Sequence, residues 1–341
     1  MTRPNSLKPR CSFLSAYVWF LLAALLGGCS ANVEDDLAAS AKQLEGLESL
    51  VVWRDGEFVV EAYYEGRAGD QRDIRSVTKG VTALLFGIAL DQNLLDLKDP
   101  VTQYLSANHS ELAPDAEGLT LEHLLTMSAG LDWDEAKLAE YVAWQSALVP
   151  THHYLSRNRV RPPGVAFNYS SGGAHLIGEV IAAAAGMPYA EFAERYLFRP
   201  LAFGPVTWQQ LRDGSTNGAS ALRMSTRDLV KLGQLMLAEG LWDGRQIVSA
   251  NWINKMTQRQ IGAGQAMGYG YLWWIPEYNE RSWVARGFGG QQLIVLPEHR
   301  SVVVTTARWR GLDGARSAYQ AIAIGQYVEL KLASQLAAGS I

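Results

Sequence analysis

Apolar runs typical of strands occur near both ends of the chain. Residues 50–53 and 58–64 are rich in β-branched and aromatic side chains, and Asp55-Gly56 lies between the two runs. An Asp-Gly pair in that position is a strong signal for a β-hairpin. Four more runs near the C-terminus are predicted strands, and they cover residues 270–275, 282–285, 292–296 and 301–306.

The middle of the chain has a helical pattern from about residue 96 to 240. Within it we expect a short helix over 120–127, with Thr120 as N-cap, and an apolar helix over 174–185. A further helix over about 314–333 follows the last strand. Strands at both ends around a helical insertion predict an α+β fold, in which one antiparallel sheet is flanked by N- and C-terminal helices.

These patterns also predict the domain boundaries. The folded domain is expected over 45–335. Its α/β part comprises about 45–95 and 240–335, and its helical part about 96–239. The polar, alanine-rich segment 29–44 is expected to be a tether that leads into a first helix.

Residues 1–28 have the pattern of a secretion signal. Basic residues precede an apolar stretch over 13–26, which ends in small residues before Cys29 and Ser30. This junction resembles a bacterial lipobox, so we expect cleavage before Cys29 and lipidation of its thiol. Ser30 resembles the sorting pattern for the outer membrane, facing the periplasm of the bacterial cell envelope. An uncleaved anchor, or an ordinary signal peptide with an incidental cysteine, are the alternatives.

Composition excludes several classes of protein. With 48% hydrophobic and 19% charged residues and a net charge of −4, the chain is an ordinary globular protein. It has no basic patch that would suggest binding of nucleic acid, and nothing implies a partner protein. His152-His153 has no further ligand at metal spacing, so no metal and no cofactor are expected.

The strongest chemical signal is the pair Ser76 and Lys79, which precedes an apolar helix over 81–90. Residues three apart share one face of a helix, so the hydroxyl and the ammonium can lie side by side at its first turn. A serine becomes a good nucleophile when a neighbouring group takes its proton. The alternative is that Ser76 is only an N-cap and Lys79 is solvated.

Two further segments could complete a site with this pair. Tyr169 lies in a polar loop just before the apolar helix over 174–185. Beside a lysine ammonium its phenolate would be favoured, and it could then act as a base. The glycine-rich run 287–290 follows a predicted strand, where backbone can approach a ligand closely.

In order and spacing, Ser76-Val77-Thr78-Lys79, Tyr169-Ser170-Ser171 and Ala285-Arg286-Gly287-Phe288-Gly289-Gly290 resemble the motifs of the β-lactamase-related serine hydrolases. That group includes class C β-lactamases, penicillin-binding D,D-peptidases, carboxylesterases and 6-aminohexanoate-dimer hydrolases. The resemblance covers about residues 45–335. It implies a β-lactamase/transpeptidase-like fold and an acyl-enzyme mechanism on a small ester, amide or peptide.

The resemblance also implies a role for each motif residue. Ser76 would be acylated, Lys79 would stabilise its alkoxide and share its proton, and Tyr169 would take that proton and pass it to the leaving group. The backbone N–H groups of Ser76 and Phe288 would form the oxyanion hole. The expected substrate-binding residues are Ser171, Arg286, Gly287, Gly289 and Trp133.

Two departures from the family pattern bear on the substrate. Ser171 stands where class C β-lactamases have asparagine, and Ala285 stands where they have the lysine that helps to bind a carboxylate. Arg286 is one place along and, by strand alternation, is expected to face away. We therefore expect ester or amide hydrolysis. The alternatives are a D-alanyl peptidase or weak β-lactamase, and a catalytically silent lipoprotein that binds peptidoglycan.

Overall fold

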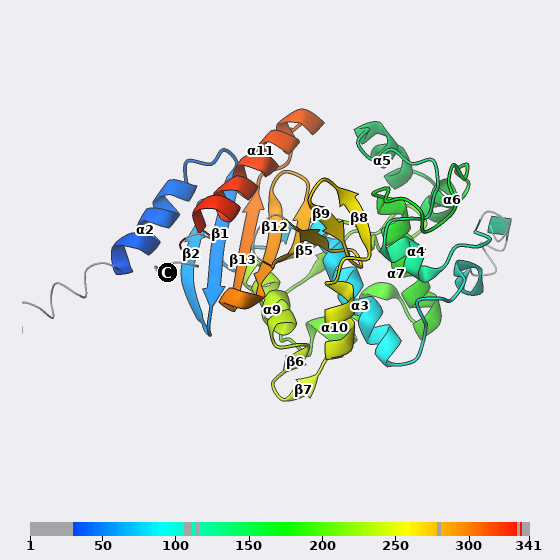
Figure 1. The fold of residues 1–341 in the computed structure, drawn as a ribbon, viewed down its shortest axis with the longest axis horizontal. Helices are drawn as coiled ribbons and strands as arrows, with labels where there is room; N and C mark the ends of the chain where they lie inside the picture. Colours follow the sequence, from blue (N-terminus) through cyan, green and yellow to red (C-terminus); the bar gives the residue numbers. More distant parts are fainter. Residues whose placement is uncertain (1–29, 106–110, 113–115, 278–280, 333–334, 336–341) are drawn as a thin grey trace, which may run out of the picture.

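The computed structural model describes residues 30–105, 111–112, 116–277, 281–332 and 335. Its central element is an eight-stranded antiparallel sheet in the order β2-β1-β13-β12-β11-β10-β9-β8 (Figure 1). The strands, in chain order, are β1 (Leu47–Arg54), β2 (Glu57–Tyr63), β8 (Ile261–Gly264), β9 (Met267–Tyr269), β10 (Trp274–Pro276), β11 (Trp283–Gly287), β12 (Gln291–Leu296) and β13 (Ser301–Ala307). The prediction that N- and C-terminal segments share one antiparallel sheet is confirmed.

The N-terminal strands join the sheet beside its last strand. Val51 of β1 pairs with Val304 of β13 on one side and with Glu61 of β2 on the other. The hairpin turn between β1 and β2 has positive φ at Asp55 (49°) and Gly56 (104°). Two central residues with positive φ match the turn that suits the twist of paired strands. The predicted hairpin is therefore confirmed.

Helices cover both faces of the sheet, and strand alternation divides its side chains between two cores. On one face Val52 and Val303 pack with α2 (Ser30–Ala41) and with the C-terminal helix, which comprises α11 (Gly314–Gln326) and the π-helical turn η6 (Tyr327–Leu332). On the other face Val51 and Val304 belong to the larger core, together with residues of α3 (Thr78–Asp91) and α10 (Ala250–Met256). The buried helix α3 thus has the sheet behind it.

Two expected boundaries differ from the structure. The segment 29–44, expected as a tether, contains helix α2, because Leu37 and Ala41 lie about one turn apart and are buried against the sheet. The signal segment and Cys29 lie outside the described residues. Helix α9 (Thr226–Leu237) packs against β13 and β12 of the large sheet. This part of the expected helical region therefore belongs with the sheet and not with the insertion.

The remaining insertion lies beyond one end of the sheet (Figure 1). It contains mostly short helices around α7, and the small sheet β3-β5-β4 joins it to the segment before Ser76. The elements of this region and its borders are β3 (Arg72–Asp73), η1 (Arg75–Val77), η2 (Val101–Tyr104), α4 (Leu121–Leu125), α5 (Leu138–Gln145), α6 (Pro150–Leu155), α7 (Ser171–Ala185), α8 (Tyr189–Ala193), η4 (Glu194–Phe198), β4 (Thr207–Trp208) and β5 (Leu222–Met224).

Two smaller differences complete the comparison with the expected elements. Residues 270–272 are not part of a strand, since Leu272 has a φ of 61° and β10 begins only at Trp274. The structure also has a short hairpin of β6 (Leu241–Trp242) and β7 (Arg245–Gln246), which was not predicted. The one-turn helix η5 (Pro297–His299) lies between two predicted strands. Within the described ranges no single helix is long and apolar enough to span a membrane. One bent pair, Ser171–Ala185 with Tyr189–Phe198, meets that test together at an angle of 80°.

Candidate active site

Ser76 lies in the one-turn helix η1, immediately before α3 begins at Thr78. Every residue from Thr78 to Ala89 is buried, so the helix that follows the serine is held on all sides by the core. Gly80 permits this close packing, because a Cβ there would lie 2.9 Å from the Trp273 ring and 3.2 Å from the Cβ of Ala285. The serine is therefore carried on a rigid element, as the apolar pattern predicted.

The residue before the serine has an unusual backbone conformation. Arg75 has a φ of 48°, in the left-handed region that non-glycine residues seldom adopt. Its N–H donates to the Asp73 carboxylate at 2.9 Å, and its carbonyl oxygen accepts from the Thr78 hydroxyl at 2.6 Å. These bonds stabilise a conformation that typically costs about 1–3 kcal/mol and that clusters at functional sites.

Lys79 is the central cation of the site. Only 2% of it is exposed, and its Nζ donates to the Oγ of Ser76 at 3.1 Å, the Oγ of Ser171 at 3.0 Å and the carbonyl oxygen of Ala219 at 3.0 Å. The three ammonium protons thus have three acceptors. Burial lowers the pKa of Lys79 to about 8, although the nearby Glu135 carboxylate acts in the opposite direction. The neutral amine is therefore accessible near physiological pH.

Tyr169 lies in the loop just before α7, as predicted. Its ring stacks on Trp274 with a centroid separation of 5.7 Å, and the Nζ of Lys79 lies 4.8 Å from the ring centroid. Burial raises the pKa of Tyr169 well above its usual value, and the Glu135 charge adds to this, while a hydrogen bond with Ser76 opposes it. The expectation of a favoured phenolate is therefore wrong, because the ammonium faces the ring and desolvation disfavours the anion.

Ser171 is the first residue of α7 and is completely buried. Its hydroxyl lies between Lys79 and Glu135, accepting from the Nζ of Lys79 and donating to a carboxylate oxygen of Glu135. Ser171 was expected to bind substrate. In the structure it contacts Lys79 and Glu135 and does not line the cleft around Ser76. The sequence analysis missed Glu135 altogether, since its only local signal is an acidic pair, Asp134-Glu135, in a turn before α5.

The end of β11 closes the opposite side of the site. A Cβ on Gly287 would lie 2.7 Å from the carbonyl oxygen of Ile74, so only glycine lets this strand approach η1 so closely. Phe288 follows it and lines the same cleft as Ser76. Arg286 also lines this cleft, although strand alternation places it on the face opposite Ala285. This position near the end of β11 agrees with the expected place of Arg286 among the substrate-binding residues, and it differs from the orientation expected from strand alternation.

The cleft around Ser76 has a volume of about 760 Å³, within the range of sites for small ligands. Its lining is mainly apolar and aromatic, with Leu138 and Val142 from α5 facing Trp309 and Leu312 from the segment before α11. The residues that line it include Arg75, Ser76, Asp134, Glu135, Tyr141, Asn168, Tyr169, Trp274, Arg286, Gly287 and Phe288. Five predicted site residues therefore line one cleft, namely Ser76, Tyr169, Arg286, Gly287 and Phe288.

Besides Ser171, two more expected substrate-binding residues do not line this cleft. Trp133 is 4% exposed and packs edge-on against Trp144 and Tyr154, and its Nε1 donates to Glu135 at 3.0 Å. Gly289 is buried in the turn after β11, where its φ of 81° and a contact with Trp309 require glycine. Both residues contact residues that line the cleft, Glu135 and Trp309 respectively. The local sequence could not distinguish this supporting role from direct contact with substrate.

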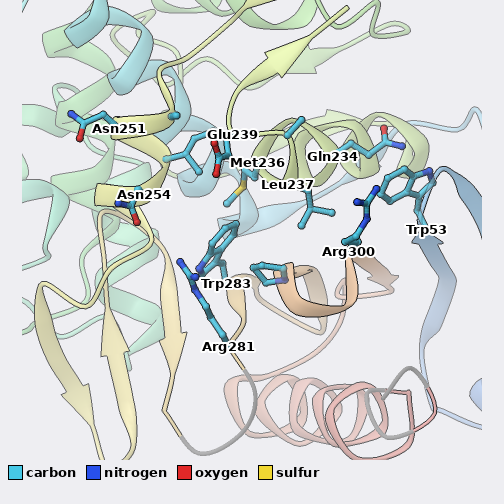
Figure 2. A pocket seen from close by; sticks show the side chains of 14 residues that line it. Trp53, Gln234, Met236, Leu237, Glu239, Asn251, Asn254, Arg281, Trp283 and Arg300 are labelled. Carbon is cyan, nitrogen blue, oxygen red and sulfur yellow. The ribbon is translucent and has the colours of Figure 1, made fainter. Parts of the chain in front are cut away.

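A second cavity, of about 670 Å³, lies on another part of the molecule (Figure 2). Trp53 lies on one side of it and Asn251 and Asn254, from α10, on the other. Trp283 lies between them, with the Arg281 guanidinium 5.3 Å from its ring centroid. None of the motif residues lines this cavity. Within the described ranges, no group of three or more His, Cys, Asp or Glu side chains is placed to hold a metal ion.

Comparison with known proteins agrees with this geometry. The Beta-lactamase family matches residues 33–326 of the chain. The 6-aminohexanoate-dimer hydrolase of Paenarthrobacter ureafaciens is 26% identical over 301 residues, which cover 78% of this chain and 74% of that protein.

Solved structures give the same fold. The penicillin-binding protein from Bacillus halodurans superposes with a TM-score of 0.68 at 16% identity, covering 86% of this chain and 99% of that one. The penicillin-binding protein homologue from Pyrococcus abyssi has a TM-score of 0.65 at 22% identity, covering 88% and 77%. With the Beta-lactamase match extending over most of its length, and with a β-lactamase/transpeptidase-like fold around Ser76, Lys79 and Tyr169, the chain belongs to the Beta-lactamase family.

Proposed function

We propose that the protein is a serine hydrolase that cleaves an ester or amide through a covalent acyl-Ser76 intermediate. The observation that carries this proposal is the 3.1 Å contact between the Nζ of Lys79 and the Oγ of Ser76, in a cleft large enough for a small substrate. An alcohol needs a neighbouring base, and a buried lysine whose pKa is lowered can supply one at neutral pH.

In the first half-reaction neutral Lys79 takes the Ser76 proton as the Oγ attacks the substrate carbonyl. The carbonyl oxygen becomes an oxyanion, which the N–H groups of Ser76 and Phe288 stabilise. Tyr169, a neutral phenol, donates its proton to the leaving group and is reprotonated from Lys79. Water then attacks the acyl-enzyme, with the same groups returning the proton to Ser76. This assignment reverses the expected role of Tyr169, which acts here as an acid first.

The cleft lining favours a substrate with an apolar group. Leu138 and Val142 lie one turn apart on α5 and are 47% and 49% exposed, yet both line the cleft beside Ser76. Exposed leucine and valine side chains would gain by covering an alkyl or aryl group, at about 25 cal/mol for each Å² of apolar surface removed from water. An ester or amide with such a group is therefore the preferred substrate class.

A D-alanyl peptidase or weak β-lactamase remains the second candidate. It is favoured by Arg75 and Arg286, which both line the cleft and could bind a substrate carboxylate. For either activity, the signal segment and Cys29 support a site of action in the cell envelope, with the enzyme anchored by lipid to the outer membrane and facing the periplasm.

A fluorophosphonate probe tests the proposed function directly. The probe should add once to the purified protein, and peptide mass spectrometry should place it on Ser76. Ser76→Ala should remove both labelling and hydrolysis of a p-nitrophenyl ester. Esterase activity that persists in Ser76→Ala at the wild-type rate would overturn the proposal. A protein that is folded but neither labelled nor active would be the silent peptidoglycan-binding lipoprotein instead.

A further inference from the structure

Glu135 makes three hydrogen bonds beside the catalytic lysine. Its Oε2 accepts from the backbone N–H of Ser171 at 2.5 Å and from the Nε1 of Trp133 at 3.0 Å, and its Oε1 accepts from the Ser171 hydroxyl. The Trp133 indole is itself fixed by edge-on packing against Trp144 and Tyr154. The carboxylate is therefore held in one place by a buried indole and by the first turn of α7.

These contacts fix the direction of the hydrogen bond between Ser171 and Lys79. An ionised carboxylate only accepts hydrogen bonds, so the Ser171 hydroxyl must donate its single proton to Glu135. Its oxygen can then only accept from Lys79, at 3.0 Å. The hydrogen bonds from Lys79 to Ser171 and from Ser171 to Glu135 thus run in one direction, which favours the protonated form of Lys79.

Resting on the proposed function, we propose that Glu135 is a positioning residue for catalysis. Acting through Ser171, it orients the Lys79 amine toward Ser76 and its charge favours the protonated lysine. It is not assigned contact with the reacting atoms. Its task is to stabilise the ammonium that forms when Ser76 gives up its proton, since an anion nearby stabilises a developing cation.

Arg75, Tyr169 and Ala219 also face Lys79. Arg75, on the preceding turn, is a cation whose charge lowers the pKa of Lys79, whereas Glu135 raises it and burial lowers it most. The Tyr169 ring from the loop before α7 faces the ammonium at 4.8 Å, and the Ala219 carbonyl accepts from it. Within the described residues, Glu135 is thus the carboxylate whose charge favours the protonated form of this lysine.

The test compares Glu135→Gln with Asp132→Asn. Glutamine keeps the shape and an acceptor for the Ser171 N–H but removes the charge, while Asp132→Asn removes the same charge from an exposed residue three places away that does not line the cleft. The pH dependence of kcat/KM for a short p-nitrophenyl ester is measured for both. Because the carboxylate raises the lysine pKa, its loss should move the acidic midpoint to lower pH, by roughly one pH unit. Asp132→Asn should leave the midpoint unchanged.

A second readout does not depend on activity. The NMR signal of ¹³Cε-labelled Lys79, assigned by its loss in Lys79→Arg, gives the lysine titration midpoint in the folded protein. Glu135→Gln should lower this midpoint, and after Ser171→Ala the additional effect of Glu135→Gln on kcat/KM should be much smaller, because residues that act through one another are not additive.

The two proposals fail in different ways. If Glu135→Gln lowers kcat/KM or thermal stability but moves neither the pH profile nor the NMR midpoint, Glu135 has only a structural role and this inference is overturned. If the fluorophosphonate probe never reaches Ser76 in the wild-type protein, the proposed function fails, yet the NMR midpoint still decides whether Glu135 controls the charge of Lys79.

Discussion

The Oγ of Ser171 lies 3.0 Å from the Nζ of Lys79, and that Nζ lies 3.1 Å from the Oγ of Ser76. Lys79 and Ser171, from two helices and 92 positions apart in the chain, are thereby joined by one hydrogen bond. α7 contributes Ser171 at its first turn, while α3 contributes Lys79 at its own first turn. The Nζ of Lys79 therefore donates to two hydroxyl oxygens and one backbone carbonyl oxygen, at the place where the two helices begin.

Hydrolysis should depend on pH through Lys79. Its pKa is lowered to about 8, mainly by burial, so at pH 6 only a small fraction of the amine is neutral. If the neutral amine is the base, kcat/KM should rise about tenfold for each pH unit below about pH 7 and level off above about pH 8. A stopped assay with p-nitrophenyl butyrate between pH 5.5 and 9.5 measures this profile.

Lys79→Arg is the matched control, because arginine keeps the positive charge but does not lose its proton in this range. It should be inactive at every pH. A flat wild-type profile over the same range would contradict the assignment of Lys79 as base.

Tyr169→Phe should lower kcat by about a hundredfold to ten-thousandfold, the usual contribution of a positioned proton donor. The ring would still stack on Trp274, so folding should be unaffected. The loss should be smaller for p-nitrophenyl esters, whose leaving group needs little protonation, than for alkyl esters or amides. Rates for the two leaving-group classes, compared between variant and wild type, check this prediction; equal losses would indicate that Tyr169 acts at another step.

The side of the cleft formed by α5 should determine which length of acyl chain the enzyme prefers in its ester substrate. Leu138→Ser and Val142→Ser should each lower kcat/KM for p-nitrophenyl octanoate several-fold relative to the acetate, because each loses apolar contact with the longer chain. Leu148→Ser provides the control, since Leu148 is 71% exposed and does not line the cleft. If all three variants, or none, change the octanoate-to-acetate ratio, the apolar group of the substrate lies elsewhere.

Short acyl esters should be hydrolysed far faster than penicillins or cephalosporins. Ala285 has no charge with which to hold a β-lactam carboxylate, and Ser171 is already bonded to Lys79 and Glu135. Each missing charge-assisted hydrogen bond typically costs about 1.5–3 kcal/mol, or about ten- to a hundredfold. Nitrocefin and p-nitrophenyl butyrate, assayed under identical conditions, measure the difference.

A larger kcat/KM for nitrocefin would reverse this prediction and point to Arg286, which lines the cleft, as the carboxylate ligand. Arg286→Gln would then be expected to lower nitrocefin turnover while sparing the neutral ester.

Cys29→Ser should release the protein from the membrane fraction, since stable anchoring needs two or more acyl chains. Fractionation followed by metabolic labelling with palmitate measures both consequences. Palmitate that remains on the Cys29→Ser protein would show that the lipobox interpretation is wrong.

The local pattern was sufficient for most of the elements and for the placement of Ser76 beside Lys79. The Asp55-Gly56 turn, the strands at both ends and the buried helix after Ser76 follow from periodicity and turn chemistry. Helical spacing alone placed Lys79 beside Ser76, because three residues make almost one turn. The spacing of the three motifs then indicated the family to which the chain belongs.

Tertiary structure alone decided the environment of each motif residue. Neighbours that are distant in sequence raise the pKa of Tyr169 and bury Ser171 and Trp133. They also determine that Arg286 lines the cleft. The acidic pair that contains Glu135 does not reveal its role locally, because that role comes from Ser171, 36 positions later. Desolvation and hydrogen bonding act through space, so a linear pattern can name the chemical groups but cannot assign their protonation or their partners.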